Sequence, residues 1–513
     1  MTGAECLLET LAANGIEHCF MNPGTSEMRF VAALDSVPEV RGVLCLFEGV
    51  CSGAADGYAR MTGRPAATLL HLGPGLANAL SNLHNARKAR SPVVNIVGEH
   101  STQHMKYDAP LSADIEAFAR PVSAAVRTLR DAAEMGNAAS EAIASAIQPP
   151  GQVSTLIVPA DFSWSPAGPC GPRVPTPLRS APAEEAIAEA ACLLRREGAA
   201  ILLGGRAAGE RGLAAAARLH AALGIRVFID RNTPRIPAGR GRFQPPVIPY
   251  FPEAALAALA AVRHMIVVES QAPVSFFGYP NTPSYLLPEG CEVFTLAARH
   301  EDGAAALEAL VERFGAPEPA PAEPETKAAD LAGPFTADAA GAILSARLPA
   351  GAILSDEMVS SGGAVLPHLR HAAPHDRMPV TGGSIGQGLP VALGASFACP
   401  DRQVIALEAD GSALYTLQAL WTMARENRNV ISIIFANRRY QILEIEMRRT
   451  GSRPGKMAQE VIGIGRPDLD FVELSRGMGV PATRASTAAE FDAQLCEALA
   501  SGGPRLIEAV LVC

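Results

Sequence analysis

The stretch RQVIALEADGSALYTLQALWTMARENRNVISIIFAN, residues 402–437, decides the fold class of this chain. Residues 404–408 (VIALE) are a short apolar run that ends at a turn, which predicts a buried strand. The turn ADGS at 409–412 leads into a helical pattern that runs from about 413 to 427. A second buried strand is predicted over 430–436 (VISIIFA). Strand, helix and strand in this order predict a parallel α/β sheet.

Two oxygen-bearing side chains lie at the carboxyl ends of these predicted strands. Asp410 follows the first strand and Asn437 follows the second. In a parallel α/β sheet, ligands bind beyond the carboxyl ends of the strands, and a helix N-terminus there favours an anion. A carboxylate, an amide oxygen and the N–H groups of the turn suit a hard cation that holds a phosphate ester. The simplest such pair is Mg²⁺ on a diphosphate.

This combination of strand, turn, helix, strand and asparagine resembles the metal and diphosphate motif of thiamine-diphosphate (ThDP) enzymes. That motif normally begins Gly-Asp-Gly and ends Asn-Asn, whereas this chain has Ala409 in the first place and Arg438 after Asn437. The alanine adds a methyl group near a diphosphate oxygen. We therefore expect weaker cofactor binding if the backbone at Ala409 needs a positive φ. The remaining residues of the motif are intact.

A second stretch places a carboxylate at the end of another predicted strand. Residues 43–47 (VLCLF) predict a strand, Glu48 follows it, and GVCSGAADGYARMTG predicts a helix made of small residues. A carboxylate at the end of a buried strand is costly unless it has a partner. In one interpretation Glu48 is a core residue satisfied by a backbone N–H or an arginine. In the other, which the resemblance implies, it bonds N1′ of the thiamine aminopyrimidine, so that the 4′-imine can remove the thiazolium C2 proton.

The length of 513 residues fits two or three domains. Two segments rich in proline, 163–185 and 316–325, divide the chain. They predict an N-terminal domain at 1–165, a central domain at 180–315 and a C-terminal domain at 330–513. Each part alternates strand-like and helix-like runs, so the expected fold class is α/β, with three mainly parallel sheets flanked by helices.

The composition argues against several kinds of partner. The net charge is −9 and the sequence pI is about 5.7, which favours neither nucleic acid nor an anionic membrane. No run of eighteen apolar residues predicts a membrane span, and the acidic N-terminal helix pattern does not resemble a signal peptide. The ten cysteines are scattered without paired spacing, which predicts reduced thiols in the cytoplasm.

The middle segment 199–230 predicts a strand, a Gly-Gly turn, a helix and a strand, and it resembles a Rossmann-type unit. It lacks GxGxxG, and Arg206 follows the two glycines. A dinucleotide site is one interpretation. We favour a structural domain without a cofactor, and FAD is not expected.

Five motifs together resemble one superfamily of ThDP-dependent enzymes, which includes pyruvate oxidase, acetolactate synthase and benzoylformate decarboxylase. In chain order they are NPGTSE, LFEGVCSGAADGYAR, HLGPGLANALSNLHNA, TGGSIGQGLPVALG and EADGSALYTLQALWT. The first three follow predicted strands of the N-terminal part, so their polar groups are expected to gather at one sheet edge. Within the superfamily the chain most resembles benzoylformate decarboxylase and short acetolactate-synthase-like proteins.

The resemblance also implies roles at the cofactor. Ile385 would be the apolar wedge that bends the cofactor, and the carbonyl of Gly383 would receive its 4′-amino group. The carbonyl of Arg439 would complete the protein ligands of Mg²⁺ beside Asp410 and Asn437. The other implied cofactor contacts are Glu48, Pro23, Gly24, Asn78, Ser360, Gly411 and Ser412.

The substrate side is implied by fewer residues. His71 matches a catalytic histidine of benzoylformate decarboxylase and precedes a predicted glycine-rich turn at 73–75, and Thr25 falls where that family has a serine. The alternative for His71 is a hydrogen-bonded structural histidine. The second catalytic histidine of that family is missing here, because Gly278 occupies the corresponding position. His100 and His104 could face either the substrate or the surface.

The resemblance implies an enzyme that decarboxylates a 2-oxo acid with ThDP and Mg²⁺, through an enamine that is protonated to an aldehyde. An acetolactate-synthase-like carboligase would pass the same acyl anion to a second carbonyl compound. Two further hypotheses are a non-catalytic regulatory protein of the same fold and an NAD- or FAD-dependent oxidoreductase. The resemblance further implies a homodimer or homotetramer whose active sites are shared between chains.

Overall fold

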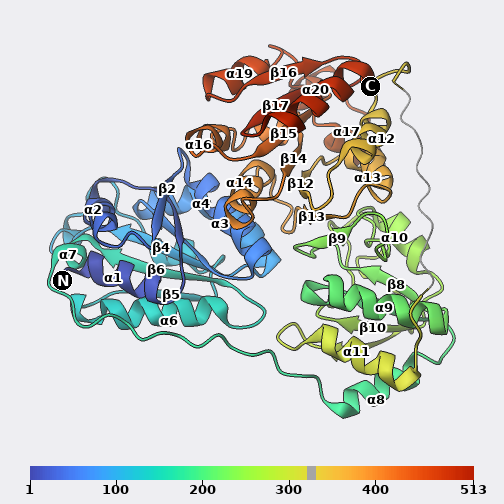
Figure 1. Cartoon of the computed structure of the whole chain (residues 1–513), viewed down its shortest axis with the longest axis horizontal. Coiled ribbons are helices and arrows are strands. Elements are labelled where there is room, and N and C mark those ends of the chain that lie inside the picture. Colours follow the sequence, from blue (N-terminus) through green and yellow to red (C-terminus); the bar gives the residue numbers. More distant parts are fainter. Residues whose placement is uncertain (320–330, 513) are drawn as a thin grey trace.

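A computed structural model describes residues 1–319 and 331–512. Most of the predicted linker at 316–325, the first residue of the predicted C-terminal domain and Cys513 lie outside the described residues. Three separate sheets organise the described chain, and they follow one another along the sequence (Figure 1). The predicted α/β class with mainly parallel sheets flanked by helices is therefore confirmed. The domain boundaries at 165–180 and 315–330 stay a prediction.

The first sheet has six parallel strands in the order β2-β1-β3-β4-β6-β5. Its central strands are buried along their whole length, because helices cover both faces. The strands are β1 (His18–Asn22), β2 (Arg41–Leu44), β3 (Ala66–Leu70), β4 (Val93–Glu99), β5 (Ala125–Thr128) and β6 (Val153–Pro159).

The second sheet has four parallel strands in the order β11-β10-β7-β8, and its strand-turn-helix-strand unit is the predicted Rossmann-like one. Its strands are β7 (Ala199–Leu203), β8 (Arg226–Ile229), β10 (His264–Val268) and β11 (Glu292–Ala297).

The third sheet has seven strands in the order β16-β17-β15-β14-β12-β13-β9. The middle segment supplies β9, which pairs antiparallel with β13, while the other pairs are parallel. Arg235 next to β9 bonds Asp376 of β13 at 2.9 Å and helps to fix this edge strand. The strands are β9 (Ile236–Ala238), β12 (Ile353–Glu357), β13 (His375–Pro379), β14 (Val404–Ala409), β15 (Val430–Ala436), β16 (Ala482–Ala485) and β17 (Arg505–Val510).

Twenty α-helices flank these sheets in the described chain. Up to the end of the middle segment they are α1 (Gly3–Ala13), α2 (Met28–Ala33), α3 (Glu48–Thr62), α4 (Leu72–Ala89), α5 (Ile115–Ala119), α6 (Met135–Ile147), α7 (Ala160–Trp164), α8 (Glu184–Leu193), α9 (Glu210–Leu223), α10 (Pro252–Leu259) and α11 (Gly303–Phe314). After it they are α12 (Ala337–Arg347), α13 (Gly362–Leu369), α14 (Gly388–Ala398), α15 (Asp410–Ala413), α16 (Ala419–Arg425), α17 (Gln441–Arg449), α18 (Lys456–Ile462), α19 (Phe471–Gly477) and α20 (Ala488–Ser501).

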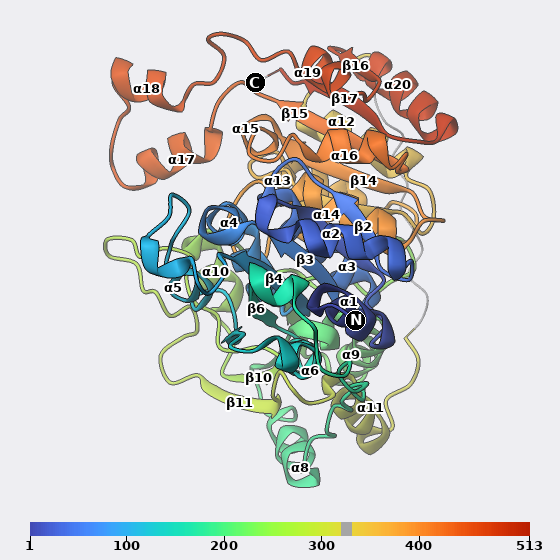
Figure 2. The ribbon, with the colours of Figure 1, turned by 90° about the vertical axis from the view of Figure 1, so that its left-hand side faces the viewer.

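Helices α3 and α14 join the first and third sheets into one body (Figure 1). Glycines let the two helices cross at very short distance. A Cβ atom on Gly57 would lie 2.1 Å from the Val391 carbonyl oxygen, and one on Gly394 would lie 1.9 Å from the Ala54 carbonyl oxygen. This crossing explains the run of small residues in the predicted helix after Glu48. Figure 2 shows α3 and α14 within the same layer of the molecule.

Two local predictions were wrong. The helix predicted over 413–427 is split into α15 and α16, because residues 414–418 form turns and the Thr416 hydroxyl donates to the Gly386 carbonyl at 2.9 Å. The predicted turn at 73–75 is instead the first turn of α4, and Ala113 lies against it, since a Cβ on Gly73 would be 2.4 Å from that side chain.

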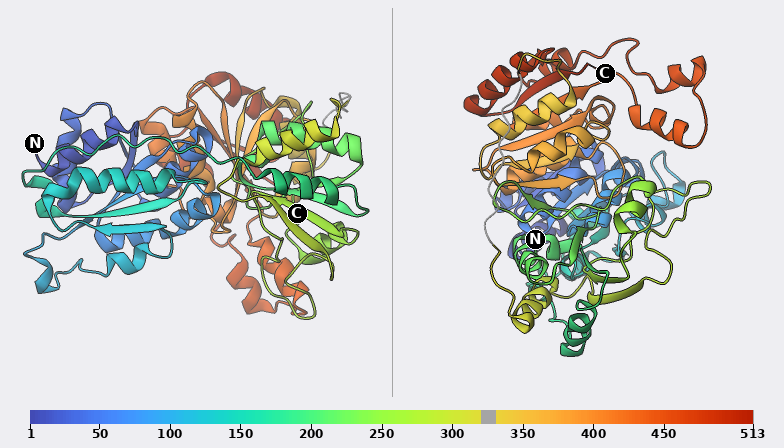
Figure 3. Two further views of the ribbon diagram at one scale, coloured as in Figure 1. Left: turned by 90° about the horizontal axis from the view of Figure 1, so that it is seen from below. Right: turned by 90° about the vertical axis from the view of Figure 1, so that its right-hand side faces the viewer.

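Helices α17 and α18 project from the body of the third sheet in both views of Figure 3. Within the described residues, no helix combines the length and the apolar character that a membrane span requires.

Candidate functional site

Glu48 is the first residue of α3, directly after the extended residue Phe47, and it is 7 % exposed. Two amides hold its carboxylate: Asn22 Nδ2 donates to Oε1 at 3.2 Å and Asn78 Nδ2 donates to Oε2 at 3.0 Å. These partners are side-chain amides, where the structural interpretation expected a backbone N–H or an arginine. Asn22, at the end of β1, was missed at the sequence level because its contact depends on two strand ends meeting.

Asp410 begins α15 at the carboxyl end of β14 and is 3 % exposed. Its Oδ2 atom accepts the N–H groups of Asn437 at 2.9 Å and Arg438 at 2.6 Å, and its Oδ1 atom accepts the N–H of Gly411 at 2.8 Å. Burial raises the pKa of Asp410, and these N–H groups oppose that rise. The carboxylate therefore joins the ends of β14 and β15, as parallel neighbours in the sheet allow.

The backbone of Ala409 is relaxed. Its φ of −79° and ψ of 146° are ordinary extended values, which any residue adopts. The condition under which we expected weaker cofactor binding, a positive φ at this position, is not met.

Asn437 and Arg439 supply two further oxygen atoms just after β15, the strand next to the one that leads to Asp410. The Asn437 Oδ1 atom accepts the N–H of Arg439 at 3.1 Å, and the Arg439 carbonyl accepts the N–H of Gln441 at 2.9 Å. Arg438 between them has a φ of 60°, so the chain turns sharply here. Each oxygen keeps a second lone pair for a cation. Among the described residues, no group of three or more His, Cys, Asp or Glu side chains could hold a metal ion.

The loop at 381–387 carries Gly383 and Ile385. Gly383 has a φ of 79°, and a Cβ on it would lie 2.3 Å from the ring of Phe276, so glycine is required on both counts. Helix α4 fixes this loop: Asn85 Nδ2 donates to the Ser384 carbonyl at 2.7 Å and Asn82 Nδ2 donates to the Gly386 carbonyl at 3.1 Å.

Two buried glutamates, Glu357 and Glu408, lie next to the start of α14, where this loop ends. The sequence analysis did not single them out. Glu357 on β12 accepts the N–H groups of Gly386 at 2.8 Å and Gly388 at 2.6 Å. Burial raises its pKa to about 7. Glu408 lies opposite on β14, where burial and then the Glu357 charge raise its pKa well above the usual range.

The predicted diphosphate contacts lie at the carboxyl ends of β12 and β14. Ser412 is 2 % exposed in α15, and a Cβ on Gly411 would lie 2.4 Å from the ring of Tyr440. Ser360 is half-buried and follows Val359, whose φ of 50° is strained for a β-branched residue. One carboxylate, one amide oxygen, one backbone carbonyl and this glycine-lined helix start fit Mg²⁺ and a diphosphate.

His71 is paired with a buried carboxylate that the sequence did not single out. Its Nδ1 atom lies 2.8 Å from Glu27 Oε2, and Glu27 is 3 % exposed. Glu27 is itself fixed by the Gly24 N–H at 2.7 Å and the Ser26 hydroxyl at 2.6 Å. A carboxylate on Nδ1 fixes the ring and leaves Nε2 for a ligand. The only sequence signal was the position of Glu27 at the end of the NPGTSE motif.

Glycine and Thr25 complete the surroundings of His71. A Cβ on Gly24 would lie 2.3 Å from the imidazole, so the ring packs directly on this backbone. A Cβ on Gly75 would lie 3.3 Å from Glu48 Oε1 and 3.4 Å from His71 Cβ, so the carboxylate and the histidine both lie next to this glycine. Thr25 is exposed at the start of a 3₁₀ turn that follows Pro23 and Gly24.

The other residues predicted near a substrate have fewer fixed contacts or lie in exposed segments. The His100 and His104 rings lie 5.4 Å apart; His104 is exposed, and His100 Nε2 is buried without a partner among the described residues. Gly278 follows Phe276 and Phe277, which are 42 % and 53 % exposed.

Comparisons with known proteins agree with this geometry. Residues 1–118 match the family model described as thiamine pyrophosphate enzyme, N-terminal TPP binding domain, and residues 363–509 match the corresponding C-terminal TPP binding domain. Together these matches cover more than half of the chain.

Relatives match over the whole length. A Mycobacterium tuberculosis protein provisionally named acetolactate synthase large subunit IlvX is 47 % identical, and the alignment covers 100 % of this chain and 99 % of that protein. Benzoylformate decarboxylase of Pseudomonas aeruginosa is 30 % identical, with 98 % and 97 % covered. The structure of a thiamine diphosphate-dependent 4-hydroxybenzoylformate decarboxylase from Rhodococcus jostii RHA1 is 27 % identical, with a TM-score of 0.86 and coverage of 100 % and 99 %.

The ordered motifs, the glycine-lined sheet edges with Glu48 and Asp410, and these full-length matches lead to one conclusion. The chain belongs to the thiamine pyrophosphate enzyme family and is a ThDP-dependent enzyme related to benzoylformate decarboxylase and acetolactate synthase.

Proposed function

We propose that this enzyme decarboxylates a 2-oxo acid with ThDP and Mg²⁺ and releases an aldehyde. The observation that carries the proposal is that Glu48 and His71 both lie next to Gly75, where Asn22 and Asn78 hold the Glu48 carboxylate and the buried Glu27 holds the His71 ring. A carboxylate for the cofactor and an imidazole for the substrate are thus combined at one sheet edge. ThDP, when bound, supplies an acidic C2–H and an electron sink for the electron pair of the C–C bond that breaks when the substrate loses CO₂.

Glu48 would hold a proton at N1′ of the aminopyrimidine. Asn22 and Asn78 keep its carboxylate at the start of α3, so little reorganisation is needed when the cofactor binds. Pro23 and Gly24 would form part of the same wall. The Gly383 carbonyl would accept the 4′-amino group, and Ile385 would press on the cofactor between its two rings.

Asp410, the Asn437 side chain and the Arg439 carbonyl would bind Mg²⁺. Gly411, Ser412 and Ser360 would contact the diphosphate at the sheet edge. Glu357 would fix the position of the Ile385 loop, since it bonds the N–H of Gly386 in that loop and the N–H of Gly388 at the start of α14.

His71 would deliver the proton that completes the aldehyde, with Glu27 fixing the imidazole through Nδ1. Thr25 is one residue beyond Gly24, which lies against the imidazole, and it would contact the substrate carboxylate. The exposed rings of Phe276 and Phe277 supply an apolar wall for the acyl group.

Carboligation is the second candidate, because the M. tuberculosis relative is named as an acetolactate synthase large subunit. A carboligase would use the same residues up to CO₂ release and would then pass the acyl anion to a second carbonyl compound. A non-catalytic ThDP-fold protein is less consistent with the intact surroundings of Glu48 and with the relaxed backbone at Ala409.

We further propose a homodimer or homotetramer with shared sites. Leu46, Val359 and Tyr415 lie within three residues of Glu48, Ser360 and Ser412, and they are 44 %, 40 % and 52 % exposed. Apolar side chains exposed beside a site are those that a second chain would cover. The described cysteines are all free, which suits a cytoplasmic enzyme.

A flavin in the middle segment is not part of the proposal. The N–H groups of Arg206 and Gly303 at the carboxyl edge of this sheet both donate to Glu269, at 3.0 and 3.1 Å. A carboxylate therefore occupies the place that a dinucleotide diphosphate would need.

The experiment is a panel of aliphatic and aromatic 2-oxo acids incubated with the ThDP- and Mg²⁺-loaded enzyme, with CO₂ and products measured. An aldehyde in equal amount to CO₂ is the expected result. A 2-hydroxy ketone in place of the aldehyde would establish the carboligase instead. No CO₂ from any acid, with cofactor binding demonstrated, would contradict both.

A further inference from the structure

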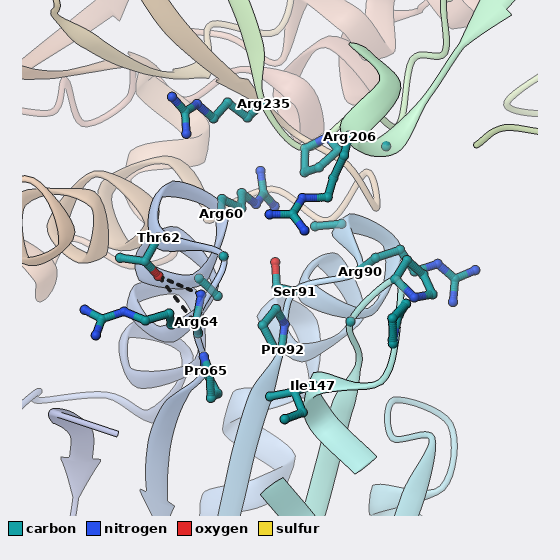
Figure 4. A pocket seen from close by; sticks show the side chains of 18 of the residues that line it. Arg60, Thr62, Arg64, Pro65, Arg90, Ser91, Pro92, Ile147, Arg206 and Arg235 are labelled. Atoms are coloured by element: carbon teal, nitrogen blue, oxygen red, sulfur yellow. Dashed lines mark hydrogen bonds between the residues drawn. The ribbon is translucent and has the colours of Figure 1, made fainter. Parts of the chain in front are cut away.

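A large cavity separates the first domain from the middle domain, away from the site described above. Its volume is about 710 Å³. Helix ends and loops of the first domain line one side, and the Gly204–Gly209 turn and neighbouring loops of the middle domain line the other (Figure 4). None of the predicted cofactor or catalytic residues lines it.

The lining is strongly cationic although the chain as a whole is acidic. Nine arginine or lysine residues line the cavity, against three aspartate or glutamate residues. Four of the arginines have carboxylate partners: Arg60 with Asp56, Arg64 with Glu17, Arg179 with Glu269 and Arg235 with Asp376. Among the described residues, the side chains of the other five cations bond no carboxylate; they are Lys88, Arg90, Arg173, Arg206 and Arg299.

These unpaired cations come from both domains and approach one another. Arg206 of the middle domain reaches across to the first domain, since a Cβ on Gly63 would lie 3.3 Å from Arg206 Nη2. Figure 4 shows Arg206 entering from above, with Arg60 of the first domain beside the end of its side chain and Ser91 beneath it. Burial and then the positive charge of Arg299 lower the pKa of Arg90, so cations of the two domains repel each other across the cavity.

Such a site selects a ligand by charge. Arginine side chains bind phosphate and carboxylate groups through two parallel hydrogen bonds, and several of them around one cavity favour an anion with more than one charged group. Backbone N–H groups contribute little here, because Glu269 already accepts those of Arg206 and Gly303. The ligand must therefore bind mainly through side chains from both walls.

We propose that this cavity binds a small organic polyanion, with two or more phosphate or carboxylate groups, between Arg90 of the first domain and Arg206 and Arg299 of the middle domain. Such a ligand would cancel the repulsion between the two domains and hold them together. The site would be distinct from the one that takes the substrate, because its lining contains neither Glu48 nor His71.

The test is calorimetry with enzyme already saturated with ThDP and Mg²⁺, so that the cofactor's own diphosphate site is filled. One arm uses fructose 1,6-bisphosphate and the other uses tricarballylate, which distinguishes phosphate from carboxylate ligands. We expect at least one of the two anions to bind in one saturable site per chain and to raise the melting temperature. In the double variant Arg90→Gln/Arg206→Gln the affinity should fall by roughly tenfold or more, since each arginine contributes a charged hydrogen bond.

The matched control is Arg29→Gln/Arg130→Gln, which removes two exposed arginines outside the cavity and the same net charge. It should bind the anion as the wild type does. If the double cavity variant does not fold, the single variant Arg206→Gln keeps the proposal testable, because the Arg206 side chain bonds no carboxylate among the described residues. Saturable binding of neither anion would overturn the proposal, and so would an equal loss of affinity in the control.

Discussion

At the scale of single residues, the pairing of His71 with Glu27 sets the substrate side of the site. Replacing Glu27 by glutamine removes the charge that faces Nδ1 while keeping the size of the side chain. We expect kcat to fall and its pH dependence to change, as in His71→Ala, for which the loss of a proton-transfer group costs about 10²–10⁴ in rate. ThDP affinity measured by calorimetry should stay close to wild type in both variants. The control is Glu99→Gln, at the end of the neighbouring strand β4. A fully active, stable His71→Ala enzyme would show that His71 is structural.

Asp410 is the second residue with a separable role. Asp410→Ala removes the only carboxylate predicted to bind Mg²⁺, so calorimetry in the presence of Mg²⁺ should show ThDP binding lost or strongly weakened. Asp468→Ala is the matched control, because Asp468 also lies near this sheet edge, where it pairs with Arg438 at 2.7 Å, but is 52 % exposed at its side chain. Unchanged ThDP affinity in Asp410→Ala would mean that the metal binds elsewhere.

At the scale of helices and strands, we expect His18 on β1 to make the contact between α3 and α14 sensitive to acid. Its ring lies 5.2 Å from Tyr58 on α3 and 5.3 Å from Phe397 on α14. Burial lowers the pKa of His18 from 6.5 to about 4. The unfolded chain therefore binds a proton at a higher pH than the folded chain does. The stability due to neutral His18 is complete above pH 6.5 and is lost as the pH falls toward 4.

Melting temperatures of wild type and His18→Phe between pH 7 and 4 test the predicted loss of stability at low pH. The wild type should lose stability more steeply below pH 6.5. His104→Phe, at an exposed position, should keep the wild-type slope. Equal slopes for all three proteins would show that His18 does not carry the effect.

The sequence predicted most elements because their patterns are local. The apolar run at 430–436 is β15 to the residue, and Asp410 and Asn437 follow adjacent strands as expected. What was missed depends on contacts distant in sequence. The break before α16 coincides with a bond from Thr416 to Gly386, and β9 exists only because it pairs with β13. Glu27 and Glu357 were missed for the same reason: Glu27 contacts His71 and Glu357 contacts Gly386, and both partners are distant in sequence.

At the scale of the whole molecule, the proposed sharing of sites between chains makes a sharp prediction. Glu48→Gln and Asp410→Ala should each be inactive alone. If one cofactor bridges Glu48 of one chain and Asp410 of the other, random heterodimers of the two variants should restore roughly a quarter of the sites. Mass spectrometry of differently tagged chains would prove subunit exchange. A mixture that exchanges subunits and stays inactive would show that each chain forms its own site.

The most direct test of the account is CO₂ release by enzyme first stripped of cofactor and then supplied with ThDP and Mg²⁺, for wild type and Glu48→Gln side by side. We predict that the wild type releases CO₂ from a 2-oxo acid only when both ThDP and Mg²⁺ are present. Glu48→Gln should bind ThDP with similar affinity and turn over about 10²–10⁴ times more slowly, because an amide cannot hold the proton at N1′ in the same way. Release of CO₂ without ThDP, or near wild-type turnover by Glu48→Gln, would contradict the account.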